Sequence, residues 1–173
     1  MSTTPSQTVG PFFAIELPYA EGPYVVADGT DGAIWLRGRV LDGAGDPIPD
    51  ALVESWQAGP DGRFDGAFRG FGRSGTDEDG AWAILTLKPA AVPAPDGGEQ
   101  APHVDLTIFA RGLLHHLVTR LYFDDDEEAN AADPVLSNLP DGARATLIAA
   151  REDGGYRLDI HLQGPDETVF FAV

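Results

Sequence analysis

The chain has 173 residues, of which 28 are acidic and 11 are Lys or Arg, so its formal net charge at pH 7 is −17. A chain this acidic repels a phosphate backbone and an anionic lipid surface at long range, which excludes general nucleic-acid binding and polybasic membrane binding. The absence of cysteine excludes disulfide scaffolds, thiolate nucleophiles, cysteine-ligated zinc and iron–sulfur clusters. The length suits a single domain with a real core, and we take residues 1–173 as one domain.

The first 30 residues are expected to form an extended arm and an irregular lead-in to a domain that spans residues 31–173. Residues 4–13 (TPSQTVGPFF) contain two prolines and a glycine, which exclude a regular helix and a central strand. The adjacent Phe12 and Phe13 argue against a frayed terminus, because a disordered tail would leave both rings in water. We therefore expect the arm to pack on this chain or on a neighbouring one. The N-terminus has neither the basic nor the apolar segment of a secretion signal, so a cytoplasmic location is expected.

Short apolar runs separated by Gly- and Pro-rich turns follow the arm. The runs that we expect to be strands are residues 34–41, 51–58, 81–87, 103–110, 117–123, 145–150, 156–163 and 168–171. Over residues 156–163 apolar and polar side chains alternate strictly, which is typical of a strand with one buried face and one wet face. About eight short strands of this kind predict an all-β fold, a β-sandwich.

One of these runs has a second interpretation. Apolar residues between positions 113 and 122 also recur at helical spacing, and a run this short cannot be assigned by its period alone. The Leu, Val, Thr, Tyr and Phe content after Leu117 favours the strand.

Histidine is the natural candidate for acid–base or metal chemistry in a chain without cysteine. His103 and Asp105, at positions i and i+2, would share one face of a strand and form a workable pair of metal ligands. A catalytic iron or zinc takes three or four protein ligands, so this pair alone is weak evidence. His115 and His116 would point to opposite faces, and His161 falls on the wet face of its strand, so we expect all three to be surface residues.

Residues 124–128 are five consecutive carboxylates, which could offer oxygen ligands to calcium. They lack the spacing and the central glycine of an EF-hand loop, so a solvated acidic loop is the favoured interpretation. The sequence also contains no Gly-rich phosphate loop and no Gly-x-Ser-x-Gly nucleophile motif.

A series of short blocks, in order along nearly the whole chain, matches the motifs of a known family. These blocks are residues 4–13, 39–42, 47–58, 61–64, 71–73, 86–89, 102–105, 109–112, 119–123 and 163–171. Together they resemble the intradiol ring-cleaving dioxygenases. The resemblance implies an intradiol dioxygenase-like β-sandwich and an activity in which non-heme ferric iron binds a catechol through its two oxygens and O2 attacks the ring between them.

The chain departs from the family's iron-binding pattern at the ligands themselves. Family members hold Fe(III) with two tyrosines and two histidines. The tyrosine positions correspond to Phe64 and Val92 in this chain, and the His-x-His pair corresponds to His103 and Asp105. Phenyl and isopropyl groups cannot coordinate a metal, and a lone histidine beside an aspartate would not hold ferric iron against water. The resemblance therefore implies that these positions are a vestigial metal site and that this chain binds no iron of its own.

This pattern is similar to the non-iron α subunit of two-chain family members, whose iron lies in a homologous β subunit. The resemblance implies a hetero-oligomer of αβ units. Such an enzyme would cleave protocatechuate with O2 to 3-carboxy-cis,cis-muconate, a step of the β-ketoadipate pathway of aromatic catabolism. The arm residues Thr8, Gly10, Pro11 and Phe12 would then line the partner's substrate pocket, together with Arg111. An arginine there would offset the carboxylate of the substrate and fix its orientation.

The distance of Arg111 from His103 follows from their spacing in the sequence, without the resemblance. Arg111 follows His103 by eight residues, which is about 26 Å along a straight strand at roughly 3.3 Å per residue, so it cannot serve a site built around His103. Without the resemblance, Arg111 and Gly112 would be interpreted as a polar turn. The alternative to an enzyme subunit is a stand-alone, non-catalytic β-sandwich that serves as a binding or assembly module.

Overall fold

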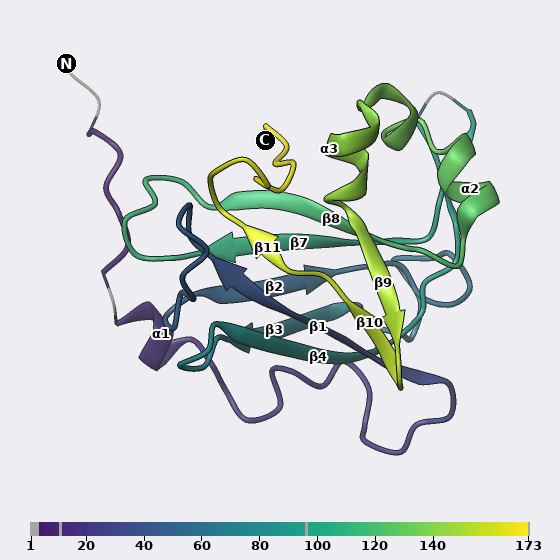
Figure 1. The fold of residues 1–173 in the computed structure, drawn as a ribbon. Helices are drawn as coiled ribbons and strands as arrows, with labels where there is room; N and C mark the ends of the chain where they lie inside the picture. Colours follow the sequence, from purple (N-terminus) through teal and green to yellow (C-terminus); the bar gives the residue numbers. More distant parts are fainter. Residues whose placement is uncertain (1–3, 11, 96, 173) are drawn as a thin grey trace.

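The computed structural model describes residues 4–10, 12–95 and 97–172, and most of its regular structure is strand (Figure 1). The strands are β1 (Ala33–Leu41), β2 (Leu52–Trp56), β3 (Phe71–Gly75), β4 (Ala81–Leu87), β5 (Val92–Pro93), β6 (Glu99–Gln100), β7 (His103–Phe109), β8 (Leu117–Phe123), β9 (Ile148–Glu152), β10 (Gly155–Arg157) and β11 (Ile160–His161). The helical elements are α1 (Phe13–Glu16), α2 (Glu127–Ala132), the 3₁₀ turn η1 (Leu136–Asn138) and α3 (Asp141–Ala145). The prediction of an all-β fold is confirmed.

The main strands form two layers around one core. One layer contains β4, β1, β10 and β9, with β11 also paired to β1, and the other contains β3, β2, β7 and β8. β9 joins the layers, because it pairs antiparallel with β10 and parallel with β8. Fully buried residues of both layers pack together, including Leu36 and Ile84 from the first and Val104, Leu106 and Leu121 from the second. Burial of each such side chain stabilises the fold by about 1.5–3 kcal/mol.

β1, β2, β4, β7 and β8 lie where the apolar runs predicted them. The ambiguous run at 117–123 is strand β8, which pairs antiparallel with β7 from Leu117 to Tyr122. Along β7 the side chains of Val104, Leu106 and Ile108 are fully buried and the intervening residues are not, as alternation requires. The β7–β8 ladder therefore supplies the backbone hydrogen bonds that a helix would otherwise have supplied.

The run at 156–163 is two short strands, β10 and β11, separated by Leu158 and Asp159. The expected buried face is confirmed, since Tyr156, Leu158 and Ile160 are all buried. The break arises because the Arg39 N–H donates to the Asp159 carboxylate at 2.9 Å instead of to a neighbouring main chain. Position 38 is glycine because a Cβ there would lie 1.8 Å from the Leu158 carbonyl oxygen.

Two other predicted strands are corrected by the structure. The strand expected at 145–150 begins only at Ile148, because α3 continues to Ala145. Residues 168–171 form no strand beyond a single bridge between Phe171 and Val118. In that segment the hydroxyl of Thr119 donates to the Val169 carbonyl oxygen at 2.7 Å, so a side chain replaces a ladder bond.

β3, β5, β6 and the helices between residues 127 and 145 were not predicted. β3 carries Phe71-Gly72-Arg73-Ser74-Gly75, a run without apolar alternation, and it is a strand because β2 pairs with it along its length. All helices in the described part of the chain are too short to span a bilayer.

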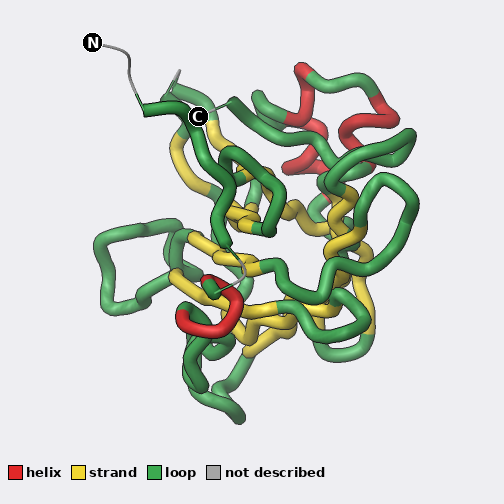
Figure 2. Tube along the Cα trace, turned by 90° about the vertical axis from the view of Figure 1, so that its left-hand side faces the viewer, coloured by secondary structure: helices red, strands yellow, loops and turns green. Residues whose placement is uncertain are grey.

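The arm with α1 and the pair of helices α2 and α3 lie at opposite ends of the molecule. In Figure 1 the arm and α1 are beside the end of β7 and the loop that leads to β8, whereas α2 and α3 are beside the start of β7. Figure 2, turned by 90°, shows the arm passing across this face as an irregular segment that ends in the single turn of α1. The two ends of β7 thus define two separate regions for function, one around His103 and one around Arg111.

Candidate functional site

His103 is held in one tautomer at the start of β7. Its side chain is buried, and Nδ1 lies 2.7 Å from the Ala101 carbonyl oxygen. Because a carbonyl can only accept, Nδ1 carries the proton and Nε2 keeps its lone pair. Burial, reinforced by the nearby Arg120 guanidinium, lowers the pKa of His103 below its ordinary value of 6.5. The imidazole is therefore neutral at pH 7.

Asp105 shares the outer face of β7 with His103, as the spacing predicted, but it is already paired. Its Oδ1 accepts from Nε of Arg120 at 2.9 Å, and the two residues are opposite each other in the β7–β8 register. Arg120 Nη1 also donates to Gln100 Oε1 at 2.7 Å and to the Tyr122 hydroxyl at 3.2 Å. The guanidinium thus has oxygen partners on β6, β7 and β8.

Two buried groups extend this network. Desolvation raises the pKa of the Tyr122 phenol to about 12, so it stays protonated, and its hydroxyl donates to Asp133 at 3.3 Å. The Asp133 carboxylate is fully buried and also accepts the backbone N–H groups of Ala101, Val135 and Leu136. Burial tends to lower the pKa of Arg120, but the hydrogen bonds that it donates to Tyr122 and Asp105 outweigh this effect, and the pKa lies above its ordinary value.

Phe64 and Val92 border the same cluster from two further segments. Phe64 stacks on Trp56 at 6.2 Å with a 17° angle between the rings, and Trp56 is the register partner of Asp105. Val92 is buried and is the register partner of Gln100, which receives the Arg120 hydrogen bond. Of the positions that the resemblance marks as vestigial ligands, Asp105 pairs with Arg120 directly, whereas Val92 and Phe64 are linked to this pair only through Gln100 and Trp56.

The donor set at these positions does not fit ferric iron. It offers one imidazole nitrogen and one carboxylate that is bound to a guanidinium, whereas Phe64 and Val92 have no donor atom. Within the described ranges no cluster of three or more His, Cys, Asp or Glu side chains is arranged to hold a metal ion. The cation that this cluster does contain is Arg120.

Arg111 lies at the other end of β7, in the turn after Phe109. Its Nε is 2.9 Å from Oδ2 of Asp50, and its side chain remains 64% exposed. A neighbouring open hollow of about 630 Å³ is lined by Arg111, Leu113 and Gln163 among others. The strand thus separates Arg111 from His103, in agreement with the spacing argument.

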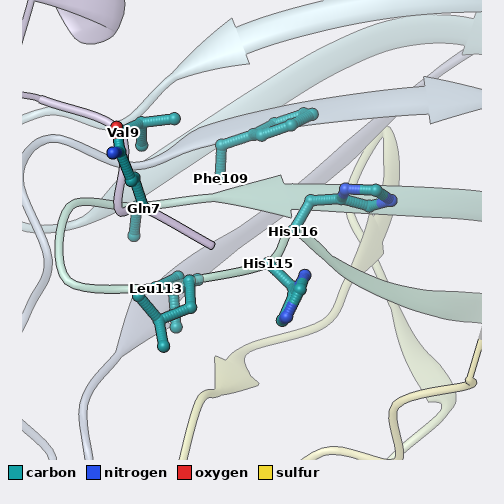
Figure 3. Close-up of a pocket in the computed structure, with 8 residues that line it drawn as sticks. Gln7, Val9, Phe109, Leu113, His115 and His116 are labelled. Carbon is teal, nitrogen blue, oxygen red and sulfur yellow. The ribbon is translucent and has the colours of Figure 1, made fainter. Parts of the chain in front are cut away.

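The arm meets this turn. The Gly112 N–H donates to the Thr8 hydroxyl at 2.7 Å, and the Ser6 hydroxyl lies 3.4 Å from His115 Nε2. Gly112 has φ +89°, a conformation that favours glycine and aims its N–H at the arm. Gln7, Val9, Phe109 and the loop around His115 and His116 enclose a pocket of about 200 Å³ (Figure 3).

The remaining arm residues pack on this chain only in part, and the expectation of packing on a neighbouring chain stays a prediction. Phe12 is 73% exposed, and Gly10 has open space around the position of a Cβ. Phe13 is half-buried, and Pro11 lies outside the described residues. Of the predicted pocket residues, the structure therefore brings Thr8 next to Arg111 and leaves Phe12 free of intramolecular contacts that would bury it.

The histidine and acidic predictions have mixed outcomes. His115 and His116 are exposed as expected, and His161 is half-buried. The acidic run is not a simple solvated loop, because Lys88 lies 2.8 Å from Asp125 and 3.0 Å from Asp126 and Tyr156 donates to Asp125 at 2.8 Å. Partial burial tends to raise the pKa of Asp125, but the hydrogen bonds from Lys88 and Tyr156 bring it below its ordinary value.

Two arginines with several partners, Arg120 and Arg73, were not singled out from the sequence. Arg120 alternates with Tyr122 on β8, which was a usable signal for a shared face, but its pairing with Asp105 depends on the register of two strands. Arg73 binds Glu54 at 2.6 Å and donates to the Leu17 carbonyl oxygen at 3.1 Å, and its backbone N–H donates to the Gly22 carbonyl oxygen at 2.7 Å. No sequence motif links Arg73 to the segment that it holds.

The two-layer strand arrangement is the fold of solved dioxygenases. A family model described as "Dioxygenase" matches residues 8–164. The chain belongs to this dioxygenase family.

The chain is 42% identical to the "Protocatechuate 3,4-dioxygenase alpha chain" of Burkholderia cepacia, across all of this chain and 98% of that one. It is 36% identical to the "Protocatechuate 3,4-dioxygenase beta chain" of the same species, across 78% of this chain and 66% of that one. The fold matches the dioxygenase domain of a dioxygenase carbohydrate-binding protein fusion from Streptomyces sp. SirexAA-E with a TM-score of 0.64 and 23% identity, covering 93% of this chain and 99% of that one.

Proposed function

We propose that this chain is the α subunit of a protocatechuate 3,4-dioxygenase and works in a hetero-oligomer of αβ units with an iron-bearing β subunit. The observation that carries the proposal is the 42% identity to an α chain over the whole length of both proteins. The similarity to a β chain supports a partner of the same fold. The reaction is the cleavage of protocatechuate by O2 to 3-carboxy-cis,cis-muconate.

The ferric iron of this reaction belongs to the β subunit in the proposal. When bound there, it supplies the activation of the catechol for attack by O2. The residues of this chain at the corresponding positions, Phe64, Val92, His103 and Asp105, offer too few donors for that ion, and the one carboxylate among them is paired with Arg120.

This chain contributes pocket walls and a charge to the partner's site. Thr8, Gly10, Pro11 and Phe12 line the pocket, and Arg111 binds the carboxylate of the substrate. The Thr8–Gly112 hydrogen bond supports this assignment because it fixes the arm beside Arg111. The 73% exposure of Phe12 supports it too, because a ring of this size in water is stabilised by burial against a partner.

The chemistry of Arg111 suits an anionic substrate. Its guanidinium is mostly exposed and contacts one carboxylate, Asp50, so several N–H donors are available. A bidentate hydrogen bond to the substrate carboxylate would orient the ring and offset its charge. Such a local positive group is needed because the chain as a whole, at −17, repels anions.

The proposal is tested by expressing this chain alone and together with a candidate β chain. We expect the chain alone to be colourless and inactive, and the co-purified complex to cleave protocatechuate and to show a visible tyrosinate-to-iron absorption band. A coloured, iron-loaded chain that turns over substrate by itself would refute the α-subunit assignment. A chain that never co-purifies with any iron-bearing homologue would favour the stand-alone binding module.

A further inference from the structure

One positive group lies between two carboxylates beside the vestigial ligand positions. Asp105 is bound to Arg120, Arg120 donates to the neutral Tyr122 hydroxyl, and that hydroxyl donates to the fully buried carboxylate of Asp133. A carboxylate in such surroundings is stable only when it is paired or fully hydrogen-bonded. Arg120 is the positive group in this chain of contacts, and it pairs directly with Asp105.

The guanidinium of Arg120 is surrounded by oxygen atoms in the way that a bound metal ion is. Its partners are a carboxylate oxygen, an amide oxygen and a phenol oxygen, at 2.9, 2.7 and 3.2 Å, and they come from three different strands. The face of Phe171 lies 5.9 Å from the guanidinium carbon. Only 21% of the side chain is exposed, so the charge is largely held inside the protein.

A nitrogen ligand adjoins this cation. His103 shares a strand face with Asp105, and its ring is 5.5 Å from that of Tyr122. Its Nδ1 is bound to a carbonyl, so Nε2 is the available lone pair.

We propose that Arg120 is the permanent cation of the vestigial metal site, that it excludes metal ions from the site, and that its removal exposes a latent site for a divalent cation on His103 and Asp105. The inference rests on the proposed function only in taking these residues as the former ligand positions. Gln100 and Tyr122 would add oxygen donors, and this mixed nitrogen and oxygen set suits a borderline ion such as Co²⁺.

The test compares Co²⁺ binding by the isolated full-length chain and by Arg120→Met, which keeps the length of the side chain and removes its charge. We expect wild-type protein to show no site with a Co²⁺ d–d absorption band, and Arg120→Met to gain one site per chain. Its affinity for Co²⁺ should exceed that of wild type by about 10- to 100-fold, the range over which groups around a metal site change its affinity. Co²⁺ should also raise the melting temperature of Arg120→Met and not that of wild type.

Three further variants make the result specific. Arg157→Met removes an arginine on β10 that pairs with Asp159 at 2.8 Å. This variant changes the net charge by the same amount and should gain no Co²⁺ site. Arg120→Met with His103→Gln should lose the gained band. Arg120→Lys keeps a positive charge and should stay free of Co²⁺, and it provides a folded comparison if Arg120→Met is unstable.

The outcomes separate this inference from the proposed function. If Arg120→Lys binds Co²⁺ as well as Arg120→Met does, or if neither binds while wild type is colourless, the cation role of Arg120 is wrong and the α-subunit assignment is untouched. If wild-type chain alone acquires iron and a visible band, the α-subunit assignment itself fails.

Discussion

Arg111 and His103 lie at opposite ends of β7 and differ in what a substitution there would change. Arg111 is exposed at a turn next to the arm, whereas His103 is buried in a network of charges. A change at Arg111 should therefore affect the proposed pocket, and a change at His103 should affect stability.

Arg111→Ala should lower kcat/KM of the αβ complex for protocatechuate by about 10- to 100-fold, the value of one charged hydrogen-bonding contact of roughly 1.5–3 kcal/mol. Turnover of catechol, which has no carboxylate, should change little. Stability should fall by no more than about 1 kcal/mol, because the pair with Asp50 is exposed on the arginine side. Arg63→Ala, which removes an exposed arginine paired with Asp65, is the matched control. Equal losses for both substrates would contradict a role in carboxylate binding.

His103 should make the isolated chain less stable in acid. Its pKa is lower in the folded state than the unfolded value of 6.5, so the unfolded chain takes up the proton first as the pH falls. The contribution is fully present above about pH 6.5 and is lost below it, with a slope of at most about 1.4 kcal/mol per pH unit. Urea unfolding of wild type and of His103→Gln between pH 7 and pH 5 measures this slope. His115→Gln should behave as wild type, and an unchanged slope in His103→Gln would show that the burial argument is wrong.

At the scale of elements, the arm is fixed at two points and exposed between them. Thr8 is bound to Gly112 at one end, and Leu17 and Gly22 are bound to Arg73 at the other. Arg73 also lies over the rings of Tyr19 and Phe71 at 5.8 and 5.5 Å. The apolar side chains between these anchors, Phe12 and Ile15, are 73% and 70% exposed, so the element presents an apolar surface whose position is set by β3.

Arg73→Lys should release the arm without unfolding the sheet. Lysine can keep a charge beside Glu54 but cannot donate at the same time to the Leu17 carbonyl oxygen in the fixed geometry of a guanidinium. We expect faster amide hydrogen exchange across residues 13–24, a loss of stability of about 1–2 kcal/mol, and reduced activity of the αβ complex. Arg39→Lys, on the surface of β1, is a control that should leave exchange in the arm unchanged. Unaltered exchange in Arg73→Lys would show that other contacts hold the arm.

The elements that could be read from the sequence are those with a clear period. β4 and β8 begin and end where the apolar runs do, because each has one face on the core. β3 has no such period and is a strand because Leu52 to Trp56 offer it a complete ladder. The helices between 127 and 145 bury few residues, so they leave a weak pattern in the sequence.

In the whole molecule, the two layers pack against each other through aliphatic and aromatic side chains. Outside this core, Arg120 links Asp105 on β7 to Gln100 on β6. The −17 charge is then a property of the surface, where acidic residues are partly paired with arginines and Lys88.

Removal of metal should accordingly leave the isolated chain unchanged. A ligand stabilises the native state only if it binds that state, so treatment with excess EDTA should shift the melting temperature by less than about 1 °C. The αβ complex treated with a reductant and a chelator should lose its visible band and its activity. A fall of several degrees for the isolated chain would reveal a bound structural metal.

The sequence alone determined the class of fold and most of the long strands, because both depend on residue type or on local period. It also placed Arg111 away from His103, since distance along a strand follows from residue count. Only the tertiary structure decided that Arg120 pairs with Asp105 and that Arg73 fastens the arm. These contacts join residues 15 and 56 positions apart, and they follow from strand register and from chain reversals that no local pattern specifies.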